Sequence, residues 1–262
     1  MTALDATATD RPAETTTTTT TTVQPPPVAP GTIQLWSDLL CPFAHVAVHR
    51  LRETRERLGL GGQVRLDHHV FPLELFNGPH PRRGTDTEAV GLGQVAPEAG
   101  FRVWTGADDL YPHTVLLAAE AVLAATSQSM DVAEALDAAL RRAFWSESRS
   151  IAHRQVVLDV AAEVADRDDG NAVLDVDQLT DALDSGRHRR ALMADFAIAR
   201  TDAIPGSPTL RLPDGSTVHN PGMTVHWEGP WAAGYPIVDA DDPRVYEHLL
   251  RRAADRGSRA AP

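Results

Sequence analysis

The chain has 262 residues, of which 42% are hydrophobic, and a formal net charge of -12. The apolar fraction is sufficient for a globular core, whereas the negative charge argues against broad electrostatic binding to nucleic acid or an anionic membrane surface. No apolar run approaches the roughly 20 residues that a membrane helix needs, and a single cysteine cannot form an internal disulfide. We therefore expect a cytoplasmic globular protein without nucleic-acid or membrane partners.

The first thirty positions differ in composition from the rest of the chain. Residues 1–30 contain a threonine tract followed by a proline cluster, and such a segment buries too little apolar surface to offset the entropy lost on ordering. They also lack the charged start and apolar core of a secretory signal. We predict that residues 1–30 form a disordered tail.

Strand and helix patterns alternate after this tail. A β-rich run predicts a strand at about Ile33 to Ser37, and helical spacing from Phe43 ends at the glycine-rich "LGLGG". The alternating run "QVRLDHHVFPL" predicts a second strand that ends at Pro72. A strand, a helix and a strand within about forty residues favour a parallel pair joined by a crossover.

The middle of the chain has mainly helical spacing. Residues 74–100 are rich in Gly and Pro, so we predict a long irregular connection there. Helices are predicted over 113–126, which is apolar on most sides, and over 131–145, which carries one apolar stripe. Asp131 and Glu134 resemble a capping box at the start of the second. Further helical segments follow.

The strand pattern returns after residue 200. Two extended arms around Pro213-Asp214-Gly215 predict a hairpin, and "DDPRVYEHLLRRAADRG" predicts a final helix with an aspartate cap. The order is thus β-α-β, helices, then β-β-α. It predicts an α/β domain formed by residues 31–75 and 201–262, with residues 76–200 inserted as a helical domain.

Two motifs carry a resemblance to a known family. "SDLLCPFAHVAV" is similar to the strand-to-helix turn where the DsbA family of thioredoxin-fold proteins places Cys-Pro-x-Cys, and "DAIPGSPTLRLPDG" is similar to its cis-proline segment. The resemblance covers about residues 31–255 and implies an α/β thioredoxin-like fold with an inserted all-helical domain. Within the family the chain resembles the FrnE-like branch, kappa-class glutathione transferases and hydroxychromene carboxylate isomerases.

The chain departs from the dithiol members of that family at one position. Ala44 stands where they have a second cysteine, so Cys41 is the only cysteine of the chain and no disulfide can be shuttled within it. Kappa-class transferases and the isomerases carry serine at the position of Cys41 and use the thiol of glutathione. This sequence therefore combines the family nucleophile with no resolving partner.

The predicted position of Cys41 at a helix N-terminus favours its thiolate. Unpaired backbone N–H groups and the helix dipole stabilise negative charge there, and such sites lower a cysteine pKa from about 8.5 towards 3.5–7.5. Pro42 suits the first helical turn because it has no N–H, and a protonated His45 one turn on is a candidate for lowering the pKa further. We predict a partly exposed Cys41 with a low pKa; the alternative is a buried structural thiol.

The second motif supplies the remaining candidate residues. A cis bond before Pro208 would turn the backbone of Ser207 towards Cys41, where it could pair with an extended thiol substrate. The candidate thiol- or substrate-binding residues are Pro42, Phe43, Ser207 and Pro208. Asp38 is either a buried acid beneath the thiol or a strand-end residue.

Two other groups of residues, histidines and aromatic residues, are candidates for binding sites. The pair His45 and His49 and the pair His68 and His69 suggest zinc, but no glutamate completes an H-E-x-x-H motif. We predict no metal site. The aromatic residues Trp227, Trp231 and Tyr235 either line a hydrophobic pocket or pack within a loop.

Three functions remain open from the sequence. The first is a monothiol oxidoreductase, in which Cys41 attacks a disulfide or electrophile and an external low-molecular-weight thiol, glutathione or an equivalent, resolves the adduct as co-substrate. The second is a glutathione-transferase-like or isomerase-like enzyme without disulfide exchange. The third is a catalytically retired thioredoxin-fold binding module. The expected partners are a small-molecule thiol or electrophile, and the oligomeric state is left open.

Overall fold

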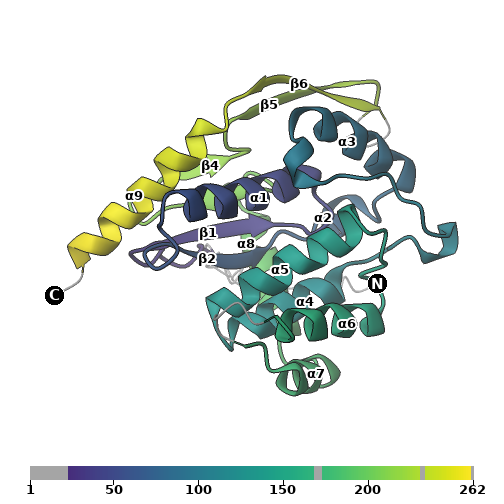
Figure 1. The fold of residues 1–262 in the computed structure, drawn as a ribbon, viewed down its shortest axis with the longest axis horizontal. Coiled ribbons are helices and arrows are strands. Elements are labelled where there is room, and N and C mark those ends of the chain that lie inside the picture. The colour runs from purple at the N-terminus through teal and green to yellow at the C-terminus, as the bar shows by residue number, and fades with distance from the viewer. Residues whose placement is uncertain (1–22, 168–172, 231–233, 261–262) are drawn as a thin grey trace, which may run out of the picture.

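A four-stranded sheet lies at the centre of the protein, which is described as a computed structural model for residues 23–167, 173–230 and 234–260 (Figure 1). The strand order is β2-β1-β3-β4. The strands are β1 (Thr32–Ser37), β2 (Arg65–Val70), β3 (Thr209–Arg211) and β4 (Thr217–His219). β1 pairs with β2 in parallel and with β3 antiparallel, and β3 pairs with β4 antiparallel. The predicted parallel pair and the predicted hairpin are both confirmed.

Helices cover both faces of this sheet, and β1 is buried along its whole length. Its alternate side chains point to opposite faces, as strand geometry requires. Ile33 and Leu35 pack in one apolar cluster with residues of α1 (Pro42–Arg57) and α9 (Arg244–Ala260). Trp36 packs on the other side, in a cluster with Ile198 and Ile204. Helices of the segment from residue 116 to residue 199 lie on this second side, whereas the helix of residues 82–95 lies beside α1 (Figure 1).

The segment between β2 and β3 is helical, as predicted. Its α-helices are α2 (Leu73–Asn77), α3 (Arg82–Val95), α4 (Leu116–Thr126), α5 (Met130–Trp145), α6 (Arg154–Ala165), α7 (Val176–Asp184) and α8 (Arg189–Ala199). Two short 3₁₀ helices span Pro97–Ala99 and Asp108–Leu110. The largest apolar cluster of the described residues draws on α4, α5, α6 and α7 and reaches Leu39 and Leu40, just before the cysteine. None of the described helices is long and apolar enough to cross a membrane.

The prediction of an irregular connection over residues 74–100 is wrong, because α2 and α3 both lie there. That prediction rested on the high glycine and proline content, and glycine disfavours helices on average. In α3, however, tertiary packing compensates for this cost. A Cβ added at Gly91 would lie 3.0 Å from two atoms of Pro236, so glycine lets strand β6 (Tyr235–Asp241) pack closely against the helix.

The predicted capping box at the start of α5 is also wrong. The cap is Ser129, whose hydroxyl accepts from the backbone N–H of Val132 at 3.1 Å. Asp131 forms an ion pair with Arg65 instead, and Glu134 turns inward to pair with arginines of α1. The helix therefore starts one residue earlier than the sequence pattern indicated.

A second, two-stranded sheet was not predicted. Strands β5 (Met223–Glu228) and β6 pair antiparallel and lie across α3 (Figure 1). A partly buried ion pair fixes this hairpin to α1, because Arg50 donates to both carboxylate oxygens of Asp241 at 2.6 and 2.8 Å. The hairpin thus covers the outer side of α3.

The last part of the predicted tail contacts the sheet. The carbonyl oxygen of Pro26 accepts hydrogen bonds from Arg211 on β3 at 2.8 Å and from Gln34 on β1 at 3.4 Å. Residues 1–22 of that tail lie outside the described residues. Contact with the sheet among the described residues therefore begins before residue 30.

Candidate active site

Cys41 is the residue that precedes the first turn of α1, as the sequence predicted. Its backbone N–H donates to the carbonyl of Asp38 at 3.3 Å, and its own carbonyl accepts from His45 N–H at 3.0 Å. Pro42 occupies the first helical position, where no N–H is needed. A tight turn after β1 therefore delivers the cysteine directly to the start of the helix.

Asp38 organises this turn. Its side chain is buried, and its two oxygens accept from the backbone N–H groups of Leu40 at 2.7 Å and of Leu73 at 2.8 Å. A carboxylate with two such partners is satisfied by hydrogen bonds although it lies away from water. Of the two alternatives for Asp38, the structure shows a buried acid directly after β1, which ties the cysteine turn to α2.

The second motif meets the first at the cysteine. The Ser207–Pro208 peptide bond is cis, and the Cys41 thiol donates to the carbonyl oxygen of Ser207 at 3.2 Å. The Ser207 hydroxyl also accepts from the backbone N–H of Asp38 at 3.0 Å. The structure therefore brings Ser207 beside Cys41, as predicted, although 166 residues separate them in the chain.

The cysteine is more deeply buried than the sequence indicated. We predicted a partly exposed thiol with a low pKa, but Cys41 is only 3% exposed. Burial, with smaller contributions from the charges of Asp38 and Glu88, raises its pKa to about 12. Hydrogen bonding to Ser207 and to the backbone N–H of Ala44 lowers the pKa without offsetting burial. The prediction was wrong because desolvation of a thiolate outweighs the helix N-terminus at this site.

His45 does not act as a protonated neighbour of the thiol. Burial lowers the pKa of His45 to about 3, although a hydrogen bond to Ala99 opposes this shift. Its Nε2 lies 2.8 Å from the Ala99 carbonyl oxygen, and its ring packs against Phe101 and Trp145. The predicted tuning role is therefore wrong, and the neutral imidazole helps to pack the far side of α1.

Phe43 lies on a different side of α1 from the Cys41–Ser207 contact. Its ring packs against a cluster that contains Val46 of α1 and Leu92 of α3. Of the four candidate binding residues, Pro42, Ser207 and Pro208 adjoin the cysteine in the structure. Phe43 instead helps to seat α3 against α1.

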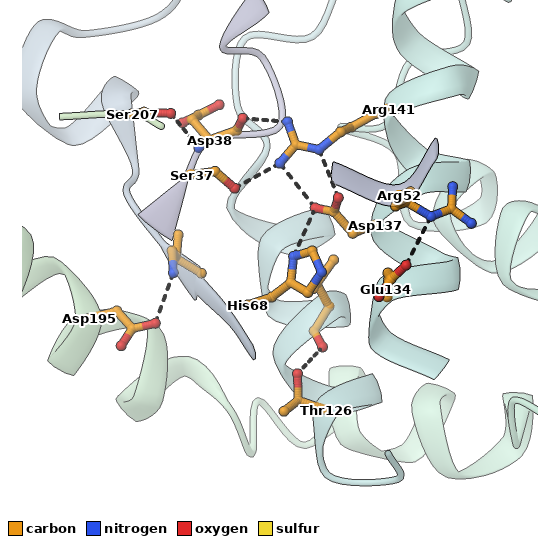
Figure 2. A network of polar contacts seen from close by, with 12 residues as sticks. Ser37, Asp38, Arg52, His68, Thr126, Glu134, Asp137, Arg141, Asp195 and Ser207 are labelled. Atoms are coloured by element: carbon orange, nitrogen blue, oxygen red, sulfur yellow. Dashed lines mark hydrogen bonds and ion pairs between the residues drawn. The ribbon is translucent and has the colours of Figure 1, made fainter. Parts of the chain in front are cut away.

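A buried arginine holds the strand end that leads to the cysteine, and the sequence reading missed it. Arg141 is 1% exposed and donates to the Asp38 carbonyl at 2.8 Å and to the Ser37 hydroxyl at 2.8 Å (Figure 2). Asp137, one turn earlier on α5, accepts from Arg141 at 2.8 and 3.1 Å. Figure 2 also shows His68 reaching Asp137 from below. The available signal was the i, i+4 spacing of Asp137 and Arg141 in this helix.

Glu88 is a second residue that the sequence reading missed. It lies on the buried face of α3, is 8% exposed, and makes no hydrogen bond or ion pair with the residues that the structure describes. Burial raises its pKa to about 8. Because residues 74–100 were predicted to form a loop, the sequence gave no reason to expect a buried side chain at position 88. In the helix, residue 88 lies on the buried face.

The four histidines considered for zinc do not converge. His49 lies near Glu53 at 3.5 Å, whereas His69 lies between Asp195 and Asp67 at 3.0 and 3.3 Å. Within residues 23–167, 173–230 and 234–260, no group of three or more His, Cys, Asp or Glu side chains is arranged to hold a metal ion.

The predicted aromatic cluster is distributed along the hairpin. Trp227 lies on β5 and Tyr235 on β6, while Trp231 is outside the described residues. Tyr235 accepts from the side chain of Gln94 at 3.3 Å and lines a surface pocket of about 360 Å³ with residues of α3 and Val103. Cys41 is not among the residues that line this pocket.

A comparison with protein families identifies the family of this chain. Residues 32–225 match the DSBA-like thioredoxin domain, a range that includes both motifs and the helical insertion between them. The chain belongs to the DSBA-like thioredoxin family. As in that family, its βαβ unit carries the cysteine and the second half of the sheet carries the cis-proline.

Solved structures support the DSBA-like fold. The cytosolic disulfide reductase DsbM from Pseudomonas aeruginosa, solved with GSH, is 21% identical, with a TM-score of 0.53 over 72% of this chain and 89% of that chain. A probable DsbA oxidoreductase from Streptomyces coelicolor is 16% identical, with a TM-score of 0.55 over 88% and 92%. A 2-hydroxychromene-2-carboxylate isomerase is 16% identical, with a TM-score of 0.53 over 71% and 87%. The comparison with curated proteins found no match.

Proposed function

We propose that this DSBA-like protein is a thiol–disulfide oxidoreductase that acts through Cys41 alone and uses an external low-molecular-weight thiol as co-substrate. The observation that carries the proposal is the contact between the Cys41 thiol and the Ser207 carbonyl, 3.2 Å apart at the start of α1. It joins the two motifs of the family at one sulfur atom. Ala44 supplies no second thiol, so the partner must come from solution.

The proposed reaction has two exchange steps. The Cys41 thiolate attacks one sulfur of a disulfide, so that a mixed disulfide forms on Cys41 and the other half leaves as a thiolate. An external thiolate then attacks the outer sulfur of the mixed disulfide and releases Cys41. Overall, one disulfide and one thiol are converted into a different disulfide and a different thiol. Cys41 returns to its free form.

The co-substrate is proposed from the chemistry of the site and from one relative. A lone cysteine can be restored only by a thiol that reaches a narrow buried site, which favours a small molecule over a protein. DsbM, whose fold this chain shares, has been solved with GSH and is described as cytosolic. We therefore propose glutathione or an equivalent thiol, in a reducing compartment such as the cytoplasm.

We infer from the burial of Cys41 that the structure corresponds to a resting state of the proposed enzyme. A sulfur that is 3% exposed must become more accessible before a disulfide can approach it in line. The Ser207 carbonyl holds the thiol in this state. Substrate binding would replace that hydrogen bond and free the Ser207 backbone to pair with an extended thiol substrate.

Mass spectrometry of the folded protein tests the proposal. We expect the wild type to gain one glutathione after incubation with oxidised glutathione and to lose it again with excess reduced glutathione. The Cys41→Ser variant should gain none and should show no glutathione-dependent turnover of a small disulfide. If the folded wild type forms no adduct while the urea-unfolded chain does, the oxidoreductase proposal is wrong. Turnover of a conjugation or isomerisation substrate by Cys41→Ser would favour the transferase or isomerase alternative.

A further inference from the structure

Three consecutive residues, Gly206, Ser207 and Pro208, form the segment that contacts the cysteine. The Ser207 carbonyl oxygen accepts from the Cys41 thiol at 3.2 Å, and the Ser207 hydroxyl accepts from the backbone N–H of Asp38 at 3.0 Å (Figure 2). The position of this carbonyl depends on what holds the two residues beside it in the chain. Contacts of Gly206 and Pro208 therefore bear directly on the environment of the sulfur.

The side chain of His219 binds the residue that follows Ser207. His219 lies on β4, where it pairs with Thr209 of β3. Its Nδ1 lies 2.9 Å from the carbonyl oxygen of Pro208. Because a carbonyl oxygen can only accept a hydrogen bond, Nδ1 carries a proton and donates it. This hydrogen bond ties Pro208 to the neighbouring strand.

The same imidazole ring covers the residue that precedes Ser207. A Cβ added at Gly206 would lie 2.7 Å from Cε1 and 3.3 Å from Nε2 of His219. Carbon atoms pack at about 3.5–4.0 Å, so the absence of a side chain at Gly206 lets the ring approach the backbone. One ring thus contacts the residues on both sides of Ser207.

Two other hydrogen bonds complete the segment. The Thr209 hydroxyl donates to the Gly206 carbonyl at 2.6 Å, and the backbone N–H of Asn220 donates to the Pro208 carbonyl at 3.1 Å. Both carbonyls beside Ser207 therefore have partners at the end of β3 and β4. The carbonyl of Ser207 is left to accept from the thiol.

We propose that His219 is a positioning residue for Cys41, which fixes the Gly206–Pro208 segment so that the Ser207 carbonyl stays within reach of the thiol. It acts through Ser207, which makes the contact with the sulfur. Its effect on substrates rests on the proposed function, because the Ser207 backbone is the group that would pair with an extended thiol substrate. Its effect on the free thiol does not depend on that function.

The location of His219 allows the role to be tested without disturbing the apolar core. β4 is an edge strand of the four-stranded sheet, and His219 is exposed. Substitution of an exposed residue usually changes stability little. A change in the behaviour of Cys41 after replacement of His219 therefore reports on the segment that the ring contacts.

Alkylation of native Cys41 by iodoacetamide, at one pH, is the first test. In His219→Ala the segment loses both contacts, and the thiol should react about fivefold faster than in the wild type, the factor expected from the loss of one hydrogen bond. His219→Asn, whose amide can donate from near the position of Nδ1, should react more slowly than His219→Ala. The control His226→Ala removes an exposed histidine of β5 that pairs with Asp239, and it should match the wild type.

A double-mutant cycle tests the contact between the ring and Gly206. Gly206→Ala alone should also speed alkylation, because the added Cβ would collide with the His219 ring and displace the segment. In the His219→Ala background the same substitution should have little further effect, since the ring is absent. Equal effects of Gly206→Ala in both backgrounds would show that the ring does not hold the segment, and the proposal would be wrong.

Turnover separates positioning from a general loosening of the fold. If the Ser207 backbone pairs with the substrate, His219→Ala should raise the KM for a small disulfide about fivefold, with a smaller change in kcat, although its thiol is alkylated faster. General loosening would expose the sulfur to both reagents and would speed both reactions. That result would contradict a positioning role.

Equal alkylation rates in the wild type and His219→Ala would overturn the role of His219 while leaving the monothiol function intact. Urea denaturation of each variant is measured alongside, and alkylation that rises only in proportion to the loss of unfolding free energy would overturn the role as well. If the wild type forms no mixed disulfide but His219→Ala is still alkylated faster, the proposed function fails and the positioning of the thiol by His219 stands.

Discussion

Arg141 of α5 donates a hydrogen bond to the backbone carbonyl of Asp38, three residues before the cysteine. The helical insertion therefore holds the turn that presents Cys41, and the two parts of the fold share one site. Arg141 is buried, and Asp137 is its only carboxylate partner within hydrogen-bond distance among the described residues. We therefore expect removal of Arg141 to reduce the stability of the fold.

Replacement of Arg141 by Met should destabilise the protein by about 3–5 kcal/mol, because it leaves the Asp137 carboxylate buried and unpaired. The double variant with Asp137→Leu should recover part of this loss. Urea denaturation measures the free energy of unfolding of each variant. The neighbouring Arg142→Met, which alters an exposed ion pair with Glu147, is the matched control and should change stability by less than about 1 kcal/mol. A small effect of Arg141→Met would show that the stability of the protein does not depend on this buried arginine.

Ala44→Cys should create an intramolecular disulfide with Cys41. Position 44 is three residues along α1 and faces the same side as the cysteine, within the Cα separation of about 4.4–6.8 Å that a disulfide needs. The variant should form this bond on mild oxidation and reduce insulin, which the wild type should do poorly. Ala47→Cys, one turn further, should not bridge. Two free thiols in oxidised Ala44→Cys, measured by mass spectrometry, would refute the assigned geometry.

Alkylation of native Cys41 should be slow and should not reach half of its maximal rate until the pH exceeds about 9, because burial raises the pKa of the thiol. The same chain in urea should react quickly, with an inflection near the free-cysteine value of about 8.5. Iodoacetamide rates measured against pH provide the comparison. An inflection below 8 in the folded protein would restore the exposed, low-pKa thiol that the sequence indicated.

His69 should make stability depend on pH in the alkaline range. Burial lowers the pKa of His69, but its hydrogen bonds to Asp195 and Asp67 outweigh burial and raise the pKa to about 9. A folded pKa above the unfolded value of about 6.5 means that the protonated form stabilises the fold. This contribution, on the order of 3 kcal/mol, is fully present below pH 6.5 and is lost as the pH rises through about 9.

The His69→Gln variant isolates this contribution. Subtracting its free energy of unfolding from that of the wild type at each pH cancels the contributions of titrating groups that the substitution leaves unchanged. The difference should be largest at pH 6 and should shrink towards pH 9.5. A difference that stays constant over this range would show that His69 is neutral in the folded protein.

Much of the fold could be predicted from local patterns. The strand before Cys41, the helix after it and the hairpin around Asp214 each have a period that a short window of sequence reveals. The helix α3 could not be predicted in this way, because one of its glycines, Gly91, is favoured by close contact with Pro236 of β6, far later in the chain. Composition alone therefore gave the wrong structure for residues 74–100.

The identity of the site was also easier to predict than its electrostatics. The sequence placed Cys41 at a helix start and Ser207 beside it, and both placements are confirmed. The pKa shift of Cys41 was predicted with the wrong sign, and His45 was expected to be protonated. Both errors arose because burial depends on segments that are distant in the chain. A helix N-terminus predicts a low cysteine pKa only where water can reach the sulfur.

The burial of Cys41 also bears on damage by peroxides. A thiol reacts with peroxide as its thiolate and must be accessible, and a sulfenic acid is usually rescued by a nearby second thiol before further oxidation. Ala44 removes that rescue within this chain. Burial and the raised pKa of Cys41 therefore both slow the reaction of the sole cysteine with peroxides.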